Sequence, residues 1–153
     1  MFMKRFNFTK QDLINWGISV DDTDTGEYIV SAPFIVDYKK GRYAGMKRRA
    51  MNSYNLKTKH KYGQDKTYKF YVIGVKIDGK TIAKTFLAHR LIWVWFNGEI
   101  PDDYDVDHID NNPINNSIDN LQLLTRKENL NKRRESDNNI WNHYMAVKEY
   151  GVK

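Results

Sequence analysis

Residues 106–116 of this chain are Val106-Asp107-His108-Ile109-Asp110-Asn111-Asn112-Pro113-Ile114-Asn115-Asn116. A carboxylate next to a histidine can hold a metal ion and a general base within one small site, because Asp107 binds hard cations and His108 exchanges protons near neutral pH. The asparagines that follow readily hydrogen-bond their own backbone, which favours a turn-rich loop. The stretch therefore predicts either a polar loop or a catalytic site, and the neighbouring residues have to distinguish the two.

Two strands and a helix are predicted around this loop. The first strand covers residues 104–107, and the second covers residues 120–124. The second strand leads into Thr125-Arg126-Lys127-Glu128, a capping box with the Thr as N-cap and the Glu as its partner. We expect the helix that starts here to run to about Arg134, which places Asn129 near the end of the first strand.

Adjacent residues on a regular strand point to opposite faces of the sheet. Asp107 and His108 can still share a site if the first strand ends at Asp107 and the backbone turns there. The asparagine-rich sequence that follows favours this turn, so we expect both side chains in one site.

Such a site would support metal-assisted hydrolysis. The carboxylate of Asp107 and the amide oxygen of Asn129 suit Mg²⁺ or Mn²⁺, which keeps several waters and takes further ligands from substrate phosphate. With an ordinary pKa of about 6.5, His108 can take a proton from an attacking water at neutral pH. The metal would stabilise charge on the phosphate and on the leaving oxygen.

Each of these residues also has a structural interpretation. An Asp-His pair at a strand end is more often a capping and hydrogen-bonding pair than a catalytic one. Asn115, Asn116 and Asn120 can simply build turns. From the residues alone, both interpretations stay open.

A hairpin and a buried helix are predicted upstream of the candidate site. Residues 68–77 and 80–86 are rich in β-branched and aromatic residues and flank the turn pair Asp78-Gly79, the signature of a two-residue β-hairpin. Residues 88–96 form a dense apolar run that we expect to be a buried helix, ended by Asn97-Gly98.

The N-terminal residues predict a short helix and an interrupted strand. Thr9 is a suitable N-cap for a helix that Gly17 ends. Residues 28–36 are apolar and β-branched, but Pro33 places this strand at a sheet edge or divides it in two. The basic segment 39–66 has weak periodicity, so we expect loops with short strands there.

The composition favours one soluble globular domain. The chain has 153 residues, with ten Tyr, seven Phe and four Trp, enough to form a packed core. It has no Cys, which excludes a disulfide scaffold and a Cys-based zinc ribbon. No apolar run reaches the length of a membrane span and the N-terminus lacks a signal-peptide core, so we expect a cytoplasmic protein with no membrane partner.

Charge is segregated along the chain, although the net charge is only +6. Residues 38–66 contain ten Lys or Arg and one acid, Asp65. Residues 91–125 contain no Lys or Arg but seven acids. A metal-dependent enzyme acting on nucleic acid needs both a polyanion-binding and a cation-binding part. Two solvated loops of opposite charge would give the same pattern.

Several ordered motifs lie between about Lys69 and Arg134, namely His89-Arg90-Leu91, Phe96-Asn97-Gly98-Glu99-Ile100-Pro101, Val106-Asp107-His108-Ile109-Asp110, Asn115-Asn116, Asp119-Asn120-Leu121 and Thr125. Together they closely resemble the HNH endonucleases of phages and group I introns, the homing type. The resemblance implies an α+β chain with a ββα-metal (HNH) nuclease core, here preceded by the β-hairpin and buried helix and by a basic N-terminal elaboration. It also implies one divalent ion and hydrolysis of a DNA phosphodiester to a 5′-phosphate and a 3′-hydroxyl.

The resemblance also implies roles for individual residues. Asp107 matches a metal ligand and His108 matches the general base. Asn120 matches the central Asn that orients the histidine by bonding across the loop, and Asn129 matches the second metal ligand. Many members of the family carry a histidine where Asn129 stands. An amide oxygen in that position favours Mg²⁺ or Mn²⁺ over Zn²⁺ or Ni²⁺.

His89 and Arg90 match a motif position for which packing and phosphate contact are both possible. After Arg134 only residues 135–153 follow, too few for a helix-turn-helix unit, so DNA recognition is expected to fall to basic residues elsewhere. The predicted DNA contacts are Lys39, Lys40, Arg42, Lys47, Arg48, Arg49, Lys57, Lys59, Lys61, Arg126, Lys132, Arg133 and Arg134. Basic residues late in a helix also interact favourably with its C-terminal dipole, which is the alternative for the last of these.

The leading hypothesis is a metal-dependent endonuclease of double-stranded DNA, acting as a monomer or homodimer in the cytoplasm of a bacterial or phage-infected cell. Its alternatives are a DNA-binding protein on an HNH scaffold that does not cut, and a nonspecific toxin-like nuclease with an inhibitor partner. The expected organisation is a basic DNA-contacting portion at residues 1–66, the nuclease core at 67–135 and a tail at 136–153.

Overall fold

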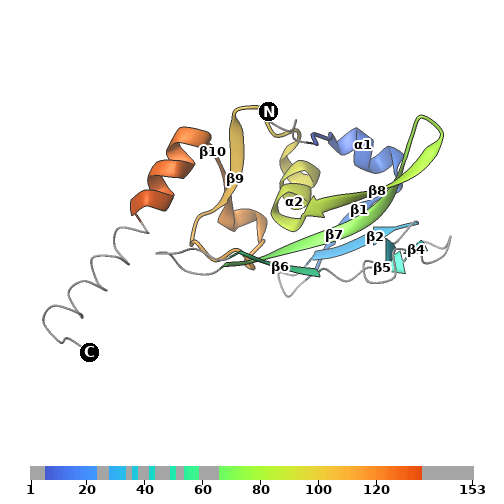
Figure 1. Ribbon diagram of the computed structural model, residues 1–153, viewed down its shortest axis with the longest axis horizontal. Helices are drawn as coiled ribbons and strands as arrows, with labels where there is room; N and C mark the ends of the chain where they lie inside the picture. The colour runs from blue at the N-terminus through green and yellow to red at the C-terminus, as the bar shows by residue number, and fades with distance from the viewer. Residues whose placement is uncertain are drawn as a thin grey trace, which may run out of the picture.

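The computed structural model describes residues 6–23, 28–33, 36–37, 42–43, 49–50, 54–58 and 66–135. The short strands between residues 36 and 58 are described by their backbone pairing alone. In chain order (Figure 1) the elements are α1 (Lys10–Asn15), β1 (Ser19–Asp22), β2 (Tyr28–Ala32), β3 (Val36–Asp37), β4 (Arg42–Tyr43), β5 (Arg49–Ala50), β6 (Tyr54–Thr58), β7 (Lys66–Ile77), β8 (Lys80–Leu87), α2 (Ala88–Asn97), β9 (Tyr104–His108), the 3₁₀ turn η1 (Ile118–Asn120), β10 (Leu121–Thr125) and a helix at 126–135.

The described strands pair in antiparallel fashion throughout. One sheet has the order β6-β7-β8 and another the order β1-β2-β5. Two further sheets are two-stranded, β3 with β4 and β9 with β10. The described part of the chain is thus a mixed α and β structure, with helices packed beside small antiparallel sheets.

The β7–β8 hairpin forms as its sequence predicts. Ile77 pairs with Lys80 around a two-residue turn. Both turn residues have positive φ, 51° at Asp78 and 76° at Gly79, as the right-handed twist of a tight hairpin requires. The predicted turn pair is confirmed.

The helix α2 follows directly after β8 and lies beside the hairpin (Figure 1). It buries five of its side chains, and Gly98 ends it with a φ of 93° while donating its N–H to Val94 O. The predicted buried helix and its stop are confirmed. Within the described ranges, no helix is long and apolar enough to span a membrane.

Local sequence signals also place α1. Thr9 Oγ1 accepts the N–H of Asp12 at 3.1 Å, and Asp12 Oδ2 accepts the N–H of Thr9 at 2.9 Å. This reciprocal pair is a capping box, and Gly17 follows the helix with a φ of 76°. The predicted cap and stop of this helix are confirmed.

The predicted strand at residues 28–36 is divided into β2 and β3, with Pro33 in a bend after β2. Proline cannot donate to a sheet ladder, which explains the interruption. Three short strands, β4, β5 and β6, occur in the basic segment that follows, as expected. The side chains of the DNA contacts predicted there are outside the described residues, since only the backbone is described for Arg42, Arg49 and Lys57, and nothing for Lys39, Lys40, Lys47, Arg48, Lys59 and Lys61.

A single buried cluster joins the N-terminal elements to the segment that holds the candidate site. It includes Leu13 and Val30 from the first part of the chain and Val106 and Leu121 from β9 and β10. The hydroxyl of Tyr28 also accepts the N–H of Ile118 at 2.8 Å, which ties β2 to the turn before β10. The candidate site thus rests on a core whose described members come from both the N-terminal elements and the β9–β10 pair. The predicted division of the chain at residue 66 stays a prediction.

Candidate active site

The frame of the site is the antiparallel pair β9–β10 followed by the helix at 126–135. In its register His108 lies opposite Leu121 and Asp107 lies opposite Gln122. The helix begins with the predicted capping box: Glu128 N–H donates to Thr125 Oγ1 at 3.2 Å, and Thr125 N–H donates to Glu128 Oε1 at 3.4 Å. The predicted order of strand, loop, strand and helix is confirmed.

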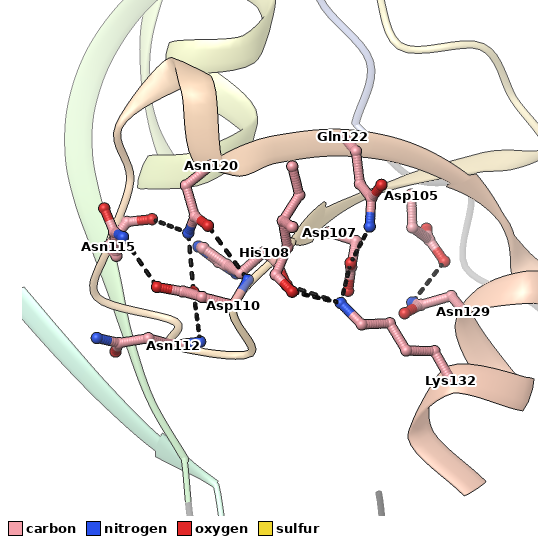
Figure 2. Close-up of polar contacts among 11 residues, drawn as sticks. Asp105, Asp107, His108, Asp110, Asn112, Asn115, Asn120, Gln122, Asn129 and Lys132 are labelled. Atoms are coloured by element: carbon pink, nitrogen blue, oxygen red, sulfur yellow. Dashed lines mark hydrogen bonds and ion pairs between the residues drawn. The ribbon is translucent and has the colours of Figure 1, made fainter. Parts of the chain in front are cut away.

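The end of β9 differs from the prediction by one residue. The strand runs through His108, and the turn begins only at Ile109. Burial alternates along it, with Val106 and His108 buried and Asp105 and Asp107 half-buried. Extended backbone sends adjacent side chains to opposite faces, and Figure 2 shows the imidazole of His108 and the carboxylate of Asp107 on different sides of the strand. The expectation that the strand ends at Asp107 is wrong.

The imidazole of His108 lies on the buried side and is held by Asn116. Its Nε2 is 2.7 Å from Asn116 Oδ1. An amide oxygen only accepts, so Nε2 carries the hydrogen in this bond and the lone pair of the neutral ring is on Nδ1. The ring of His89 lies 5.0 Å from that of His108, and the ring of Tyr68 lies 6.4 Å away. These contacts fix the orientation of the imidazole and its tautomer.

Burial lowers the pKa of His108 below the ordinary value of 6.5. The hydrogen bond to Asn116 and the charges of Asp107 and Asp110 oppose this change, and the charge of Lys66 adds to it. A lowered pKa keeps the ring neutral at neutral pH. His108 is therefore in the state in which it can accept a proton.

Asn120 holds the loop that follows His108. Its Nδ2 donates to Asp110 Oδ1 and to Asn115 O, both at 2.9 Å, and its Oδ1 accepts the N–H of Asp110 at 3.2 Å. Its backbone carbonyl accepts the N–H of Ile109 at 2.8 Å. Asn120 thus bonds across the loop, as expected from the resemblance. The hydrogen bond to the imidazole itself, however, is made by Asn116.

Asp110 is the centre of this loop (Figure 2). Its carboxylate accepts the side-chain N–H of Asn115 at 2.9 Å and the backbone N–H of Asn112 at 2.8 Å, in addition to the bond from Asn120. These hydrogen bonds lower the pKa of Asp110 to about 2. An ionised carboxylate with several donors therefore shapes the loop, and Asn111 takes the left-handed conformation, with a φ of 61°, that asparagine tolerates.

The opposite face of β9 presents Asp107 to the helix at 126–135. Asp107 Oδ2 accepts Gln122 Nε2 at 2.9 Å and Lys132 Nζ at 2.5 Å. The same ammonium donates to His108 O at 2.8 Å and to Ile109 O at 3.4 Å. Lys132 was predicted as a DNA contact, and the structure places it on the candidate metal ligand instead.

Asn129 lies on the same side of β9, one turn earlier in the helix than Lys132 (Figure 2). Its Nδ2 is 3.4 Å from Asp105 Oδ2. Asp105 and Asp107 point to the same face of the strand because they are two residues apart. The predicted pair of metal ligands therefore shares a face, while the hydrogen bond that Asn129 makes is to Asp105.

These residues fit a hard divalent cation. The ammonium of Lys132 is a stand-in cation, and it is held by oxygen atoms alone: one carboxylate oxygen and two backbone carbonyls. Oxygen donors of this kind are those that Mg²⁺ and Mn²⁺ prefer. Among the described residues, no group of three or more His, Cys, Asp or Glu side chains could hold a metal. That a metal here uses Asp107 together with Asn129 stays a prediction, since the amide of Asn129 contacts Asp105.

The remaining predicted residues divide between core and surface. His89 is 8% exposed, and burial, with the charges of His108 and Arg90, lowers its pKa to about 3. Arg90 Nη2 donates to Phe6 O at 3.4 Å. These positions fit the packing interpretation of the His89-Arg90 motif. On the last helix, Arg126, Arg133 and Arg134 are exposed.

Two residues of the site were not predicted. Asn116 belongs to one of the motifs that carry the resemblance, but the sequence predicts no role for it beyond building a turn. Tyr68 comes from β7, far from the motifs in sequence. Burial raises the pKa of its phenol above the ordinary value. The charge of Arg133 lowers this pKa and the charge of Asp107 raises it, so both charges act on the hydroxyl.

Comparison with known proteins relates part of the chain to a nuclease family. Residues 86–131 match the family of HNH endonucleases. Protein 3.8 of Escherichia phage T7 is 51% identical over 50 residues, 33% of this chain and 41% of that protein. YosQ of the SPbeta prophage of Bacillus subtilis (strain 168), named as a candidate HNH homing endonuclease, is 44% identical over 46 residues, 30% of this chain and 27% of that protein.

The uncharacterized gene 5.3 protein of Enterobacteria phage T3 is 34% identical over 73 residues, 48% of this chain and 69% of that protein. The chain thus spans less than half of the T7 and Bacillus relatives and over two thirds of the T3 protein. No solved structure matches the chain. The matched segment 86–131 contains His108, Asn116, Asn120 and Asn129. The segment 86–131 therefore belongs to the HNH endonuclease family.

Proposed function

We propose that the chain is a metal-dependent endonuclease of double-stranded DNA, of the homing type, with His108 as its general base. The observation that carries this proposal is the hydrogen bond from His108 Nε2 to Asn116 Oδ1 at the end of β9, with Asp107 on the other face of the same strand. One short segment thereby offers a neutral imidazole and a cation-binding carboxylate. The match of residues 86–131 to the HNH endonuclease family supports the nuclease class.

His108 acts on the attacking water. The hydrogen on Nε2 is engaged by Asn116, so Nδ1 takes the proton as the water oxygen bonds to phosphorus. The bond from phosphorus to the 3′ oxygen of the sugar breaks, and that oxygen takes up a proton to leave a 3′-hydroxyl and a 5′-phosphate. General-base catalysis of this kind contributes about 10²–10⁴-fold to the rate.

Asp107 and Asn129 would hold one divalent ion, Mg²⁺ or Mn²⁺. When bound, the ion stabilises negative charge on the phosphate and on the leaving oxygen. Gln122 orients the Asp107 carboxylate through its bond at 2.9 Å. Oxygen ligands alone favour these two ions over Zn²⁺ and Ni²⁺.

Exposed cations bring the DNA to the site. Arg126, Arg133 and Arg134 are exposed on the helix that also carries Asn129. The basic residues at 39–66 extend the contact along the phosphate backbone, which accounts for the segregated charge of the chain. One active site cuts one strand at a time, so a double-strand cut needs a dimer or a second binding event.

The test is incubation of a supercoiled plasmid with the protein in Mg²⁺ or Mn²⁺, with EDTA as the control. We expect nicked or linear DNA whose ends are sealed by a DNA ligase, as 5′-phosphate and 3′-hydroxyl ends are. Salt-dependent DNA binding without cleavage in either metal would contradict the proposal and favour a binding protein on the same scaffold. Discrete products support the homing type, and a uniform smear favours a nonspecific nuclease.

A further inference from the structure

Lys132 occupies the cation position beside Asp107. Its ammonium has three oxygen neighbours, Asp107 Oδ2 at 2.5 Å, His108 O at 2.8 Å and Ile109 O at 3.4 Å. The side chain of Lys132 is 26% exposed and that of Asp107 only 14%. An ammonium has three hydrogens to donate, so these three oxygens match its full donor capacity.

A divalent ion bound to Asp107 would compete with this ammonium. An ion on either oxygen of the carboxylate would lie close to the ammonium on Oδ2, and two cations that close repel each other strongly in a partly desolvated site. The described residues around the ammonium supply one negative charge in direct contact, that of Asp107. Binding of the metal therefore requires the Lys132 side chain to leave.

Phosphate is the natural partner for the side chain once it leaves. Lysine has a long flexible stem and binds phosphate as a point charge. Lys132 stands next in the chain to the exposed Arg133 and Arg134, which we assign to DNA contact. A phosphate that draws Lys132 away would uncover Asp107 at the moment when DNA is in place.

We propose that Lys132 is an internal competitor for the metal, which holds Asp107 in the free protein and releases it when DNA phosphate binds. This inference rests on the proposed role of Asp107 as a metal ligand. Its consequence is that the free protein binds Mn²⁺ weakly, and that a short DNA duplex tightens binding of the metal.

The test is a calorimetric titration of the full chain with Mn²⁺ alone, which measures binding without any cleavage. Lys132→Met removes the charge and keeps most of the stem, and we expect it to bind Mn²⁺ about tenfold tighter than the wild type, the size of effect that loss of one partly exposed ion pair allows. Lys127→Met is the matched control, since Lys127 is exposed on the same helix. We expect it to bind as the wild type does.

Two further variants keep the result interpretable. Lys132→Gln serves if Lys132→Met does not fold, as judged by thermal unfolding without metal. Asp107→Asn should lose Mn²⁺ binding, which tests the ligand independently of any nuclease activity. If both Lys132 variants bind Mn²⁺ no more tightly than the wild type, or if no variant binds it, Lys132 does not compete with the metal for Asp107. If plasmid cleavage fails, that result counts against the proposed nuclease function only. The Mn²⁺ titration still decides whether Lys132 competes with the metal.

Discussion

His108 Nε2 lies 2.7 Å from Asn116 Oδ1, and this bond fixes which nitrogen of the imidazole is free to take a proton. Asn120, the asparagine expected to orient the histidine, instead bonds Asp110 and Asn115 across the loop. The two asparagines therefore have different roles. Asn116 holds the imidazole ring, and Asn120 holds the loop that carries Asn116.

Removal of the bond to the ring should slow cleavage without unfolding the protein. Asn116→Leu keeps the size of the side chain but offers no acceptor, so Nε2–H loses its partner and the tautomer is no longer fixed. We expect single-turnover cleavage to slow by about tenfold or more, the cost of one lost catalytic hydrogen bond. Asn112→Ala is the control, because Asn112 Oδ1 only accepts an exposed backbone N–H, that of Ile114. Equal rates for the two variants would show that Asn116 does not position the base.

Loss of the hydrogen bonds that Asn120 makes across the loop should lower both the stability of the protein and its activity. Asn120→Ala removes three hydrogen bonds, two of them to Asp110. We expect the free energy of unfolding in urea to fall by about 1–3 kcal/mol. Asn131→Ala, at an exposed position of the last helix, should change it by less than about 0.5 kcal/mol. A loss no greater than that of the control would mean that these bonds do not hold the loop.

Acid should destabilise the protein through His89. Its pKa is about 3 in the folded state against an ordinary 6.5, so the unfolded chain binds the proton more readily. The free energy of unfolding is therefore unaffected by this group above pH 6.5 and falls as the pH drops from 6.5 towards 3, by about 1.4 kcal/mol per unit at most. His108, whose pKa is also lowered, adds to this fall in the same direction.

The variant His89→Phe isolates this contribution. It should show a shallower loss of the free energy of unfolding between pH 6.5 and 3, measured by denaturant titration at each pH. Above pH 6.5 the pH dependence of the two proteins should be the same. A wild-type slope retained in the variant would place the acid sensitivity elsewhere.

Asn129 should set the preference for the metal. In Asn129→His an imidazole replaces the amide oxygen, and nitrogen ligands favour Zn²⁺ and Ni²⁺. We expect the order of thermal stabilisation by metals to shift from Mg²⁺ and Mn²⁺ towards Zn²⁺ and Ni²⁺. Asn131→His controls for nonspecific binding by an added histidine on the same helix. An unchanged order of metals in the Asn129 variant would remove Asn129 from the ligand set.

Much of the frame could be predicted because its signals are local. The capping boxes at Thr9 and Thr125, the Asp78-Gly79 turn and the stop at Gly98 act within a few residues, and the structure confirms each of them. The order of strands and helix around the loop follows from them. These elements bring Asp107 and Asn129 to one face, although they are far apart in sequence.

The details that could not be predicted depend on tertiary contacts. β9 continues through His108 because that residue pairs with Leu121 and packs against His89, which the local sequence does not reveal. The site of Lys132 depends on how the last helix crosses β9. Sequence shows only that Lys132 is one of several cations, not that it contacts Asp107.

The central claim is that His108 is the general base, and single-turnover cleavage of a supercoiled plasmid by the wild type and by His108→Ala in Mg²⁺ or Mn²⁺ tests it most directly. The wild type should cut in at least one of the two metals. The variant should be slower by about 10²–10⁴-fold while keeping its fold, as judged by circular dichroism, and its affinity for DNA. A variant that cuts as fast as the wild type would contradict the account.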